Sequence, residues 1–148
     1  IFKINFFGTL NCLHALLPFL KKKNKSQVIF MSSVAGYRGL PYAAAYCSSK
    51  SAITTFAESI YNQCKNLGIA IRVINPGFVK TPLTDKNKFK MPMIIPAEKA
   101  ADIMYKKIVF SKKFEINCPW LFCFIMKILR VLPNSVYLSL TQLLIKRL

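Results

Sequence analysis

Acidic residues are scarce in this sequence. Its 148 residues include five Asp and Glu against 22 Lys and Arg, which gives a formal net charge of +17 at pH 7. Such an excess is typical of proteins that bind nucleic acid or anionic lipid, but here the basic residues are scattered and lack the interleaved aromatic residues of single-strand binders. The densest run, Lys21–Lys25, is typical of a solvated helix end. We therefore expect no nucleic-acid partner.

Metal-binding and disulfide patterns are also missing. The single histidine, His14, and the five cysteines form no Cys-x-x-Cys pair and no Cys/His cluster. The sequence therefore predicts no metal site and no disulfide framework. Unpaired cysteines favour a reducing compartment, so we expect a cytoplasmic protein.

Apolar patterns divide the chain into alternating helices and strands. Helical spacing of apolar residues covers three segments, Ile1–Leu20, Ala43–Leu67 and Pro96–Val109. Short apolar or β-branched runs predict strands at Gln27–Met31, Ile69–Ile74 and Lys113–Ile116. A strand, a helix and a strand joined by short connections form a right-handed βαβ unit. We therefore expect the α/β class, with a Rossmann-like, doubly wound parallel sheet in which Gln27–Met31 is buried on both faces.

The segment Asn75–Ile95 is predicted as a long loop. Loops of this length are uncommon unless they are functional lids or disordered. Its apolar and Met-rich side chains either bind apolar ligands of varied shape or pack against the last helices. These side chains are Phe78, Leu83, Phe89, Met91, Met93, Ile94 and Ile95.

The C-terminal segment is predicted as two apolar helices divided at Pro133, each too short to span a bilayer. Its basic residues are Lys127, Arg130, Lys146 and Arg147. Amphipathic helices of this kind either lie peripherally in the surface of an anionic membrane, or cover a substrate pocket, or form a contact between copies. We expect residues 1–118 to form one domain and residues 119–148 a helical extension.

Several polar residues stand where an α/β protein places its site. Tyr46 and Lys50 are spaced i, i+4 on a predicted helix, so their side chains share one face. A Tyr and a Lys at this spacing often occur together by chance, but the polar residues described next strengthen the prediction of a functional site. Ser33 follows a predicted strand, at the sheet edge where ligands bind. Asn5 lies upstream, and Pro76 follows the next strand.

Four motifs carry these residues, namely NFFGTL, VIFMSSVAG, YAAAYCSSKSAI and IRVINPGFVKT. Through them the sequence resembles the classical short-chain dehydrogenase/reductase (SDR) family, tightly over residues 1–81 and loosely over residues 96–116. The resemblance implies a catalytic tetrad of Asn5, Ser33, Tyr46 and Lys50. It also implies that the cofactor, NAD or NADP, contacts Tyr46, Lys50, Pro76, Gly77, Val79 and Thr81.

The resemblance further implies the interconversion of a carbonyl and an alcohol by hydride transfer. Tyr46 would supply the proton, and the Lys50 cation would favour its phenolate form and hold the cofactor ribose. Ser33 would bond the substrate oxygen, and Asn5 would hold a water that links Lys50 to solvent. The implied partners are a small, apolar or lipid-like carbonyl or alcohol and further copies of the complete protein.

The Gly-rich turn that receives a pyrophosphate in this family is not in the sequence, whose five glycines stand at positions 8, 36, 39, 68 and 77. We therefore expect the N-terminal half of the SDR fold to be absent, which leaves Gln27–Met31 as an exposed strand edge. Two functions follow. The chain is the catalytic half of an NAD(P)-dependent oxidoreductase, or it is an inactive fragment or membrane-surface or interaction protein derived from one.

Overall fold

A parallel sheet of three strands lies at the centre of the molecule. The computed structural model describes residues 1–23, 25–87 and 91–145. The strands follow the order β1-β2-β5 and are β1 (Ser26–Met31), β2 (Ile69–Pro76) and β5 (Glu115–Cys118). The prediction of an α/β fold with a parallel sheet is confirmed.

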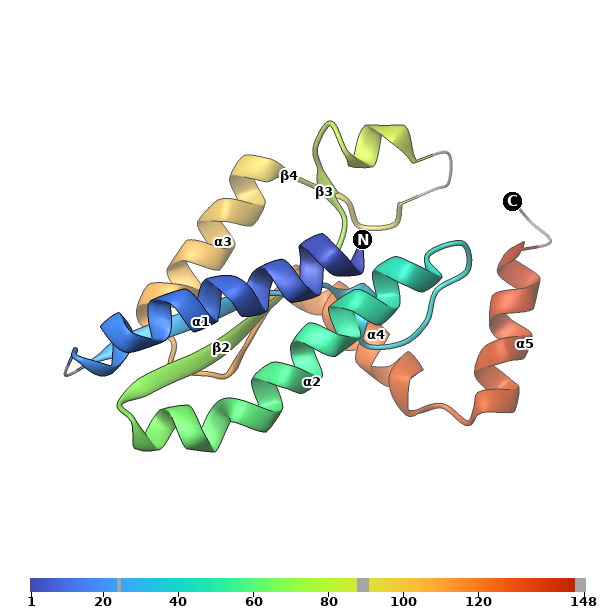
Figure 1. The fold of residues 1–148 in the computed structure, drawn as a ribbon. Helices are drawn as coiled ribbons and strands as arrows, with labels where there is room; N and C mark the ends of the chain where they lie inside the picture. Colours follow the sequence, from blue (N-terminus) through green and yellow to red (C-terminus); the bar gives the residue numbers. More distant parts are fainter. Residues whose placement is uncertain (24, 88–90, 146–148) are drawn as a thin grey trace.

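Helices cover both faces of this sheet (Figure 1). Helices α1 (Gly8–Lys21) and α2 (Ala44–Asn66) lie on one side, and α3 (Ala97–Phe110) lies on the other. The predicted βαβ unit is present as β1, α2 and β2. Gly68 follows α2 with a φ of 73°, the left-handed conformation that glycine adopts most readily at a helix end.

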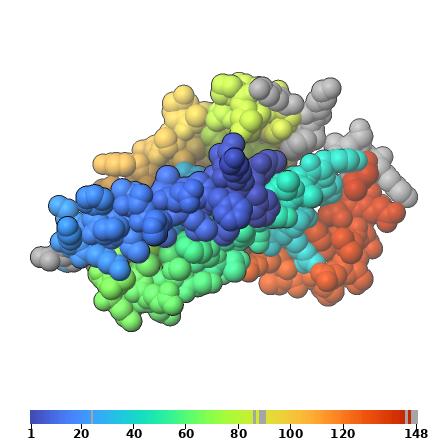
Figure 2. All heavy atoms as spheres, in the orientation of Figure 1, coloured from blue at the N-terminus to red at the C-terminus, as the bar shows by residue number. Residues whose placement is uncertain are grey.

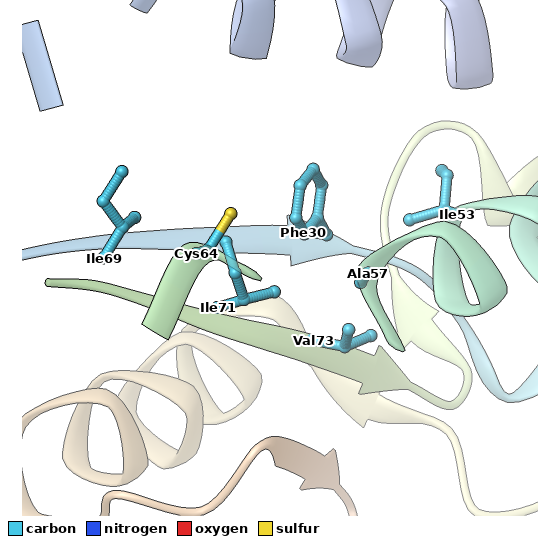
Figure 3. Packing of buried hydrophobic residues seen from close by; sticks show 7 residues of the cluster. All are labelled: Phe30, Ile53, Ala57, Cys64, Ile69, Ile71 and Val73. Atoms are coloured by element: carbon cyan, nitrogen blue, oxygen red, sulfur yellow. The ribbon is translucent and has the colours of Figure 1, made fainter. Parts of the chain in front are cut away.

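The central strand β2 and helix α2 supply most of the main core cluster. Successive side chains of a strand point to opposite faces, so Ile69, Ile71 and Val73 all point toward α1 and α2. There they pack with Phe30 of β1 and with side chains of α2 (Figure 3). Each of the three is at most 1% exposed. Arg72 points to the opposite side, toward α3.

Strand β1 lies at one edge of the sheet. Among the described residues it pairs only with β2, and of its six residues only Phe30 is buried, whereas Gln27 and Met31 are exposed. The prediction that this strand is buried on both faces is therefore wrong, because no described element covers its second face. The prediction of an exposed edge is confirmed, and an edge of this kind presents unpaired backbone groups.

The segment predicted as a long loop contains short ordered elements. Strand β3 (Val79–Lys80) pairs in parallel with β4 (Ile95–Pro96) to form a second, smaller sheet. A 3-10 turn, η3 (Thr84–Lys86), follows β3. Paired strands of two residues have no hydrophobic periodicity, so the sequence pattern did not reveal them. Phe89 lies outside the described residues.

The two predicted C-terminal helices are confirmed as α4 (Trp120–Val131) and α5 (Asn134–Ile145), with Pro133 between them. Helix α4 buries three side chains against the body of the protein, Phe122, Cys123 and Met126. Within the described ranges, no helix is long and apolar enough to cross a membrane. Lys146 and Arg147 lie outside those ranges.

Arg72 fastens α3 to the sheet. This side chain is only 4% exposed, and its guanidinium donates to the main-chain carbonyls of Lys107 and Ile108 at 2.8 Å each. Its Nε donates to the carbonyl of Lys113 at 3.0 Å. The last carbonyls of a helix have no partner within the helix and form its negative end, so a buried cation stabilises them.

We expect Arg72→Met to lower the free energy of unfolding by about 2 to 4 kcal/mol, because the variant removes three hydrogen bonds that a buried guanidinium donates. Urea unfolding followed by far-UV circular dichroism measures this loss. Lys112→Met is the matched control, since Lys112 is exposed, and it should change stability by less than about 0.5 kcal/mol. Equal effects of the two substitutions would show that the guanidinium contacts do not hold α3.

Candidate active site

Ser33 and Pro76 meet at the carboxyl edge of the sheet. Ser33 follows β1 and caps the 3-10 turn η2 (Val34–Gly36), where its Oγ accepts a hydrogen bond from the Ala35 amide at 3.2 Å. The Ser33 hydroxyl also lies 3.4 Å from the carbonyl of Pro76, at the end of β2. Ser33 is 8% exposed. The structure thus brings together two predicted site residues from neighbouring strands, at the edge where α/β proteins bind ligands.

Tyr46 and Lys50 lie one turn apart near the start of α2. The Lys50 ammonium is 5.8 Å from the centroid of the Tyr46 ring and donates to the Met31 carbonyl, at the end of β1, at 2.8 Å. Partial burial lowers the pKa of Lys50. Tyr46 is 38% exposed, so its ring remains accessible to a ligand. The predicted sharing of one helix face by these two side chains is confirmed.

Asn5 lies in a π-helical turn, η1 (Lys3–Phe7), that precedes α1. Its side-chain amide donates to the Ser49 hydroxyl at 3.1 Å, and Ser49 donates to the main-chain carbonyl of Tyr46 at 2.8 Å. The fourth predicted residue is therefore linked to the first turn of α2. Single π-helical turns inside helices are frequent at functional sites, and the apolar pattern of this segment gave no sign of one.

The turn after Ser33 is held against α2 by contacts that the sequence analysis did not foresee. The Ser32 hydroxyl lies 2.9 Å from the Lys50 carbonyl and 2.8 Å from the Thr54 hydroxyl. A Cβ on Gly36 would lie 2.9 Å from the Lys50 carbonyl carbon. Only glycine allows so close an approach of the two main chains. The signal was present in the sequence, because Ser32 and Gly36 both belong to the motif VIFMSSVAG.

The predicted cofactor segment leaves β2 and continues through β3. The Gly77 amide donates to the Cys118 carbonyl at 2.7 Å, and the Phe122 ring occupies the space beside the Gly77 Cα. Val79 belongs to β3, and the Thr81 amide donates to the Thr84 hydroxyl at 2.8 Å. The structure thus places Gly77 and Val79 on a segment that starts beside Ser33. The hydroxyl and amide of Thr81 bond to Thr84 within the same turn.

Hydrogen bonds join the loop between Ser33 and Tyr46 to the C-terminal helices. Arg38 donates to the carbonyls of Leu129 and Leu132 at 2.8 and 2.6 Å, and its guanidinium carbon lies 4.1 Å from the centroid of the Tyr137 ring. The Tyr137 hydroxyl donates back to the Gly39 carbonyl. Nothing in the local sequence pattern around Arg38 signalled this role, because its partners come from the far end of the chain.

Tyr37 adds a polar anchor beneath α4. Its hydroxyl donates to the Asn117 side chain at 2.9 Å. Burial, and then the nearby Glu115 carboxylate, raise the pKa of Tyr37 well above its usual value. Glu115 also pairs with Lys127 of α4. Lys127 therefore reaches toward the body of the protein rather than away from it.

Comparison with known proteins decides the family. A model of the short chain dehydrogenase family matches residues 1–91. The chain belongs to the short-chain dehydrogenase/reductase family. It is also 35% identical over 137 residues to an uncharacterized oxidoreductase of Myxococcus xanthus, an alignment that covers 93% of this chain and 54% of the relative. The chain spans about half the length of the curated SDR relatives that it matches.

Solved SDR structures share the fold. A short chain dehydrogenase from Burkholderia cenocepacia in complex with NADP has a TM-score of 0.79 at 23% identity, covering 94% of this chain and 56% of its own. An SDR from Burkholderia phymatum in complex with NAD has a TM-score of 0.72 at 19% identity, covering 86% of this chain and 55% of its own. The chain therefore has an SDR Rossmann-like fold over part of that fold's length.

The close contact at Gly36 can be tested by adding a methyl group. We expect Gly36→Ala to lower the free energy of unfolding by about 1 to 3 kcal/mol, because its Cβ meets the main chain of α2 at Lys50 and forces that helix to move. Gly39→Ala is the matched control, since a Cβ at Gly39 meets nothing within 4 Å. Thermal unfolding measures the stability of both variants. If Gly36→Ala is as stable as Gly39→Ala, the close approach of Gly36 to the main chain of α2 is wrong.

Proposed function

We propose that this chain is the catalytic half of an NAD(P)-dependent oxidoreductase that interconverts a carbonyl and an alcohol by hydride transfer. One observation carries the proposal. The Lys50 ammonium lies beside the Tyr46 ring and is anchored to the Met31 carbonyl, at the end of the strand that leads to Ser33. A proton donor, a cation and a hydroxyl from two separate segments therefore gather at one edge of the sheet.

These residues suit proton transfer to a developing alkoxide. In the direction of reduction, Tyr46 gives its phenolic proton to the substrate oxygen as hydride reaches the carbonyl carbon, and Ser33 donates a hydrogen bond to that oxygen. The Lys50 cation stabilises the phenolate that remains on Tyr46. Asn5, through Ser49, holds the first turn of α2, so that the Tyr46 backbone keeps its place.

The donors of the site also fit the nicotinamide end of a cofactor. A lysine ammonium has three hydrogen-bond donors, and the Met31 carbonyl takes one, which leaves two for ribose hydroxyls. Pro76, Gly77, Val79 and Thr81 form the adjoining wall. The nicotinamide supplies the hydride when it is bound. NAD and NADP are both candidate cofactors, since one of the two SDR structures named above is a complex with NADP and the other a complex with NAD.

We further propose an apolar substrate. The segments that flank the site expose apolar side chains, with Tyr42 before α2 at 83% exposure and Leu83 after β3 at 75%. Met93 and Ile94 are also exposed in the same region. Met-rich apolar surfaces adapt to ligands of varied shape. A lipid-like carbonyl or alcohol would cover these side chains, and a small polar substrate would not.

Tyr46→Phe tests the proposed acid. A chimera in which the N-terminal part of the Myxococcus xanthus relative precedes Ile1 supplies a complete SDR chain for this measurement. We expect Tyr46→Phe to reduce turnover of a carbonyl substrate by about 10² to 10⁴, because a positioned general acid contributes that much to the rate. Cofactor affinity, followed by nicotinamide fluorescence, should change little.

Tyr105→Phe provides the control for this experiment, since Tyr105 is an exposed tyrosine of α3 that lies outside both the tetrad and the apolar surface proposed for the substrate. It should retain the turnover of the parent chimera. A Tyr46→Phe protein that keeps more than about a tenth of the parent activity would remove Tyr46 from the role of proton donor.

The second candidate function, an inactive fragment, rests on the exposed edge of β1 and the lack of a Gly-rich turn. We expect residues 1–148 alone to bind neither NAD(H) nor NADP(H). The nicotinamide-end contacts must exceed an association cost of about 4 to 15 kcal/mol without a pyrophosphate site. Isothermal titration of monodisperse protein measures this. A dissociation constant in the low micromolar range would contradict the expectation and reveal a cofactor site within this half.

A further inference from the structure

The outward side of α4 is an uncovered apolar face. Its inward residues pack against the body, but large apolar side chains on the other side remain exposed, among them Trp120 at 66%, Phe124 at 55% and Ile128 at 48%. These three residues are spaced i, i+4, i+8, so they form one stripe along the helix. The exposed apolar residues on this side form a set that we call the outer apolar face, namely Trp120, Leu121, Phe124, Ile125, Ile128 and Val131.

Helix α5 lies at the end of the molecule away from α3 (Figure 2), and it too exposes apolar side chains. Among the described side chains of α5, only Tyr137 is buried. Its apolar residues stay between about two-fifths and two-thirds exposed, and they are Val136, Leu138, Leu140, Leu143 and Ile145. Large exposed apolar patches often mark a surface that contacts another molecule or a membrane. We therefore expect another molecule to cover these side chains.

The charges of this region identify what covers it. Residues 119–148 contain four basic residues and no acidic residue, within a chain of net charge +17. Across the described part of the chain, only Lys106 and Lys127 form ion pairs with acidic side chains. Arg38, Lys50, Arg72 and Lys107 donate to main-chain carbonyls, but other cations are exposed, Arg130 of α4 among them. Exposed cations attract an anionic surface, and a net charge of +17 repels a second copy of the same chain.

We propose that the outer apolar face of α4, together with α5, docks in the surface of an anionic lipid membrane. Helix α4 has 12 residues and reaches about 18 Å, well short of the roughly 30 Å hydrocarbon core, so it lies along the surface. Its inward side is occupied by protein, since Lys127 pairs with Glu115 and Arg38 binds the last carbonyls of the helix. Only the apolar side is left to enter the lipid. The proposal does not depend on the proposed enzymatic function.

Vesicle co-sedimentation of the full chain tests the proposal. Phosphatidylcholine vesicles with phosphatidylserine, about 3:1, are compared with pure phosphatidylcholine. We expect binding to the mixed vesicles only, weakened by high salt because added ions screen the attraction. The double variant Phe124→Gln/Ile128→Gln should lower the partition coefficient more than about tenfold. Gln is a good helix former and both side chains are exposed, so circular dichroism should be unchanged.

The matched control is Tyr105→Gln/Phe110→Gln, which removes two exposed apolar side chains from α3, on another side of the molecule. It should bind the mixed vesicles as the parent does. Equal losses for the two double variants, or equal binding to both kinds of vesicle, would overturn the proposal. Sedimentation velocity without lipid adds the last outcome. If the parent is a dimer and Phe124→Gln/Ile128→Gln is a monomer, the face binds a second copy of the chain and the proposal is overturned.

Discussion

The direct contact between the turn after β1 and the main chain of α2 is the constraint on which the candidate active site depends. Ser32 bonds the Lys50 carbonyl, and Gly36 lies so close to that carbonyl that no Cβ fits between them. Ser33 stands on the first of these segments, and Tyr46 and Lys50 stand on the second. The relative position of hydroxyl, phenol and ammonium is therefore set by backbone packing, which is more rigid than any side-chain contact between them.

Arginine side chains take structural positions at the C-terminal ends of two helices. With five acidic residues in the chain, few basic side chains can find an ion-pair partner. Arg72 and Arg38 instead bind the free carbonyls at the ends of α3 and α4. Helix C-termini carry partial negative charge, so this arrangement stabilises the cation and the helix together. Within the described ranges most lysines form no ion pair, and the net charge of +17 gives the protein a positive field.

The two arginine contacts tie the site to the rest of the fold. Arg72 holds α3, which follows the small β3–β4 sheet. Arg38 holds the turn between α4 and α5 against the loop that separates Ser33 from Tyr46. The C-terminal helices therefore support one wall of the site on their inward side, while their outward side stays apolar and exposed. One face of each helix therefore packs against the protein, and the opposite face is exposed.

The sequence by itself determined the α/β class, the strands β1 and β2, the helix that carries Tyr46 and Lys50, and the family motifs, because each depends on local periodicity or on short runs of residues. Tertiary structure alone decided the partners of Arg38 and Arg72, the inward direction of Lys127 and the pairing of β3 with β4. These features join residues far apart in the chain. Their identity depends on which segments pack together, and no local pattern records that.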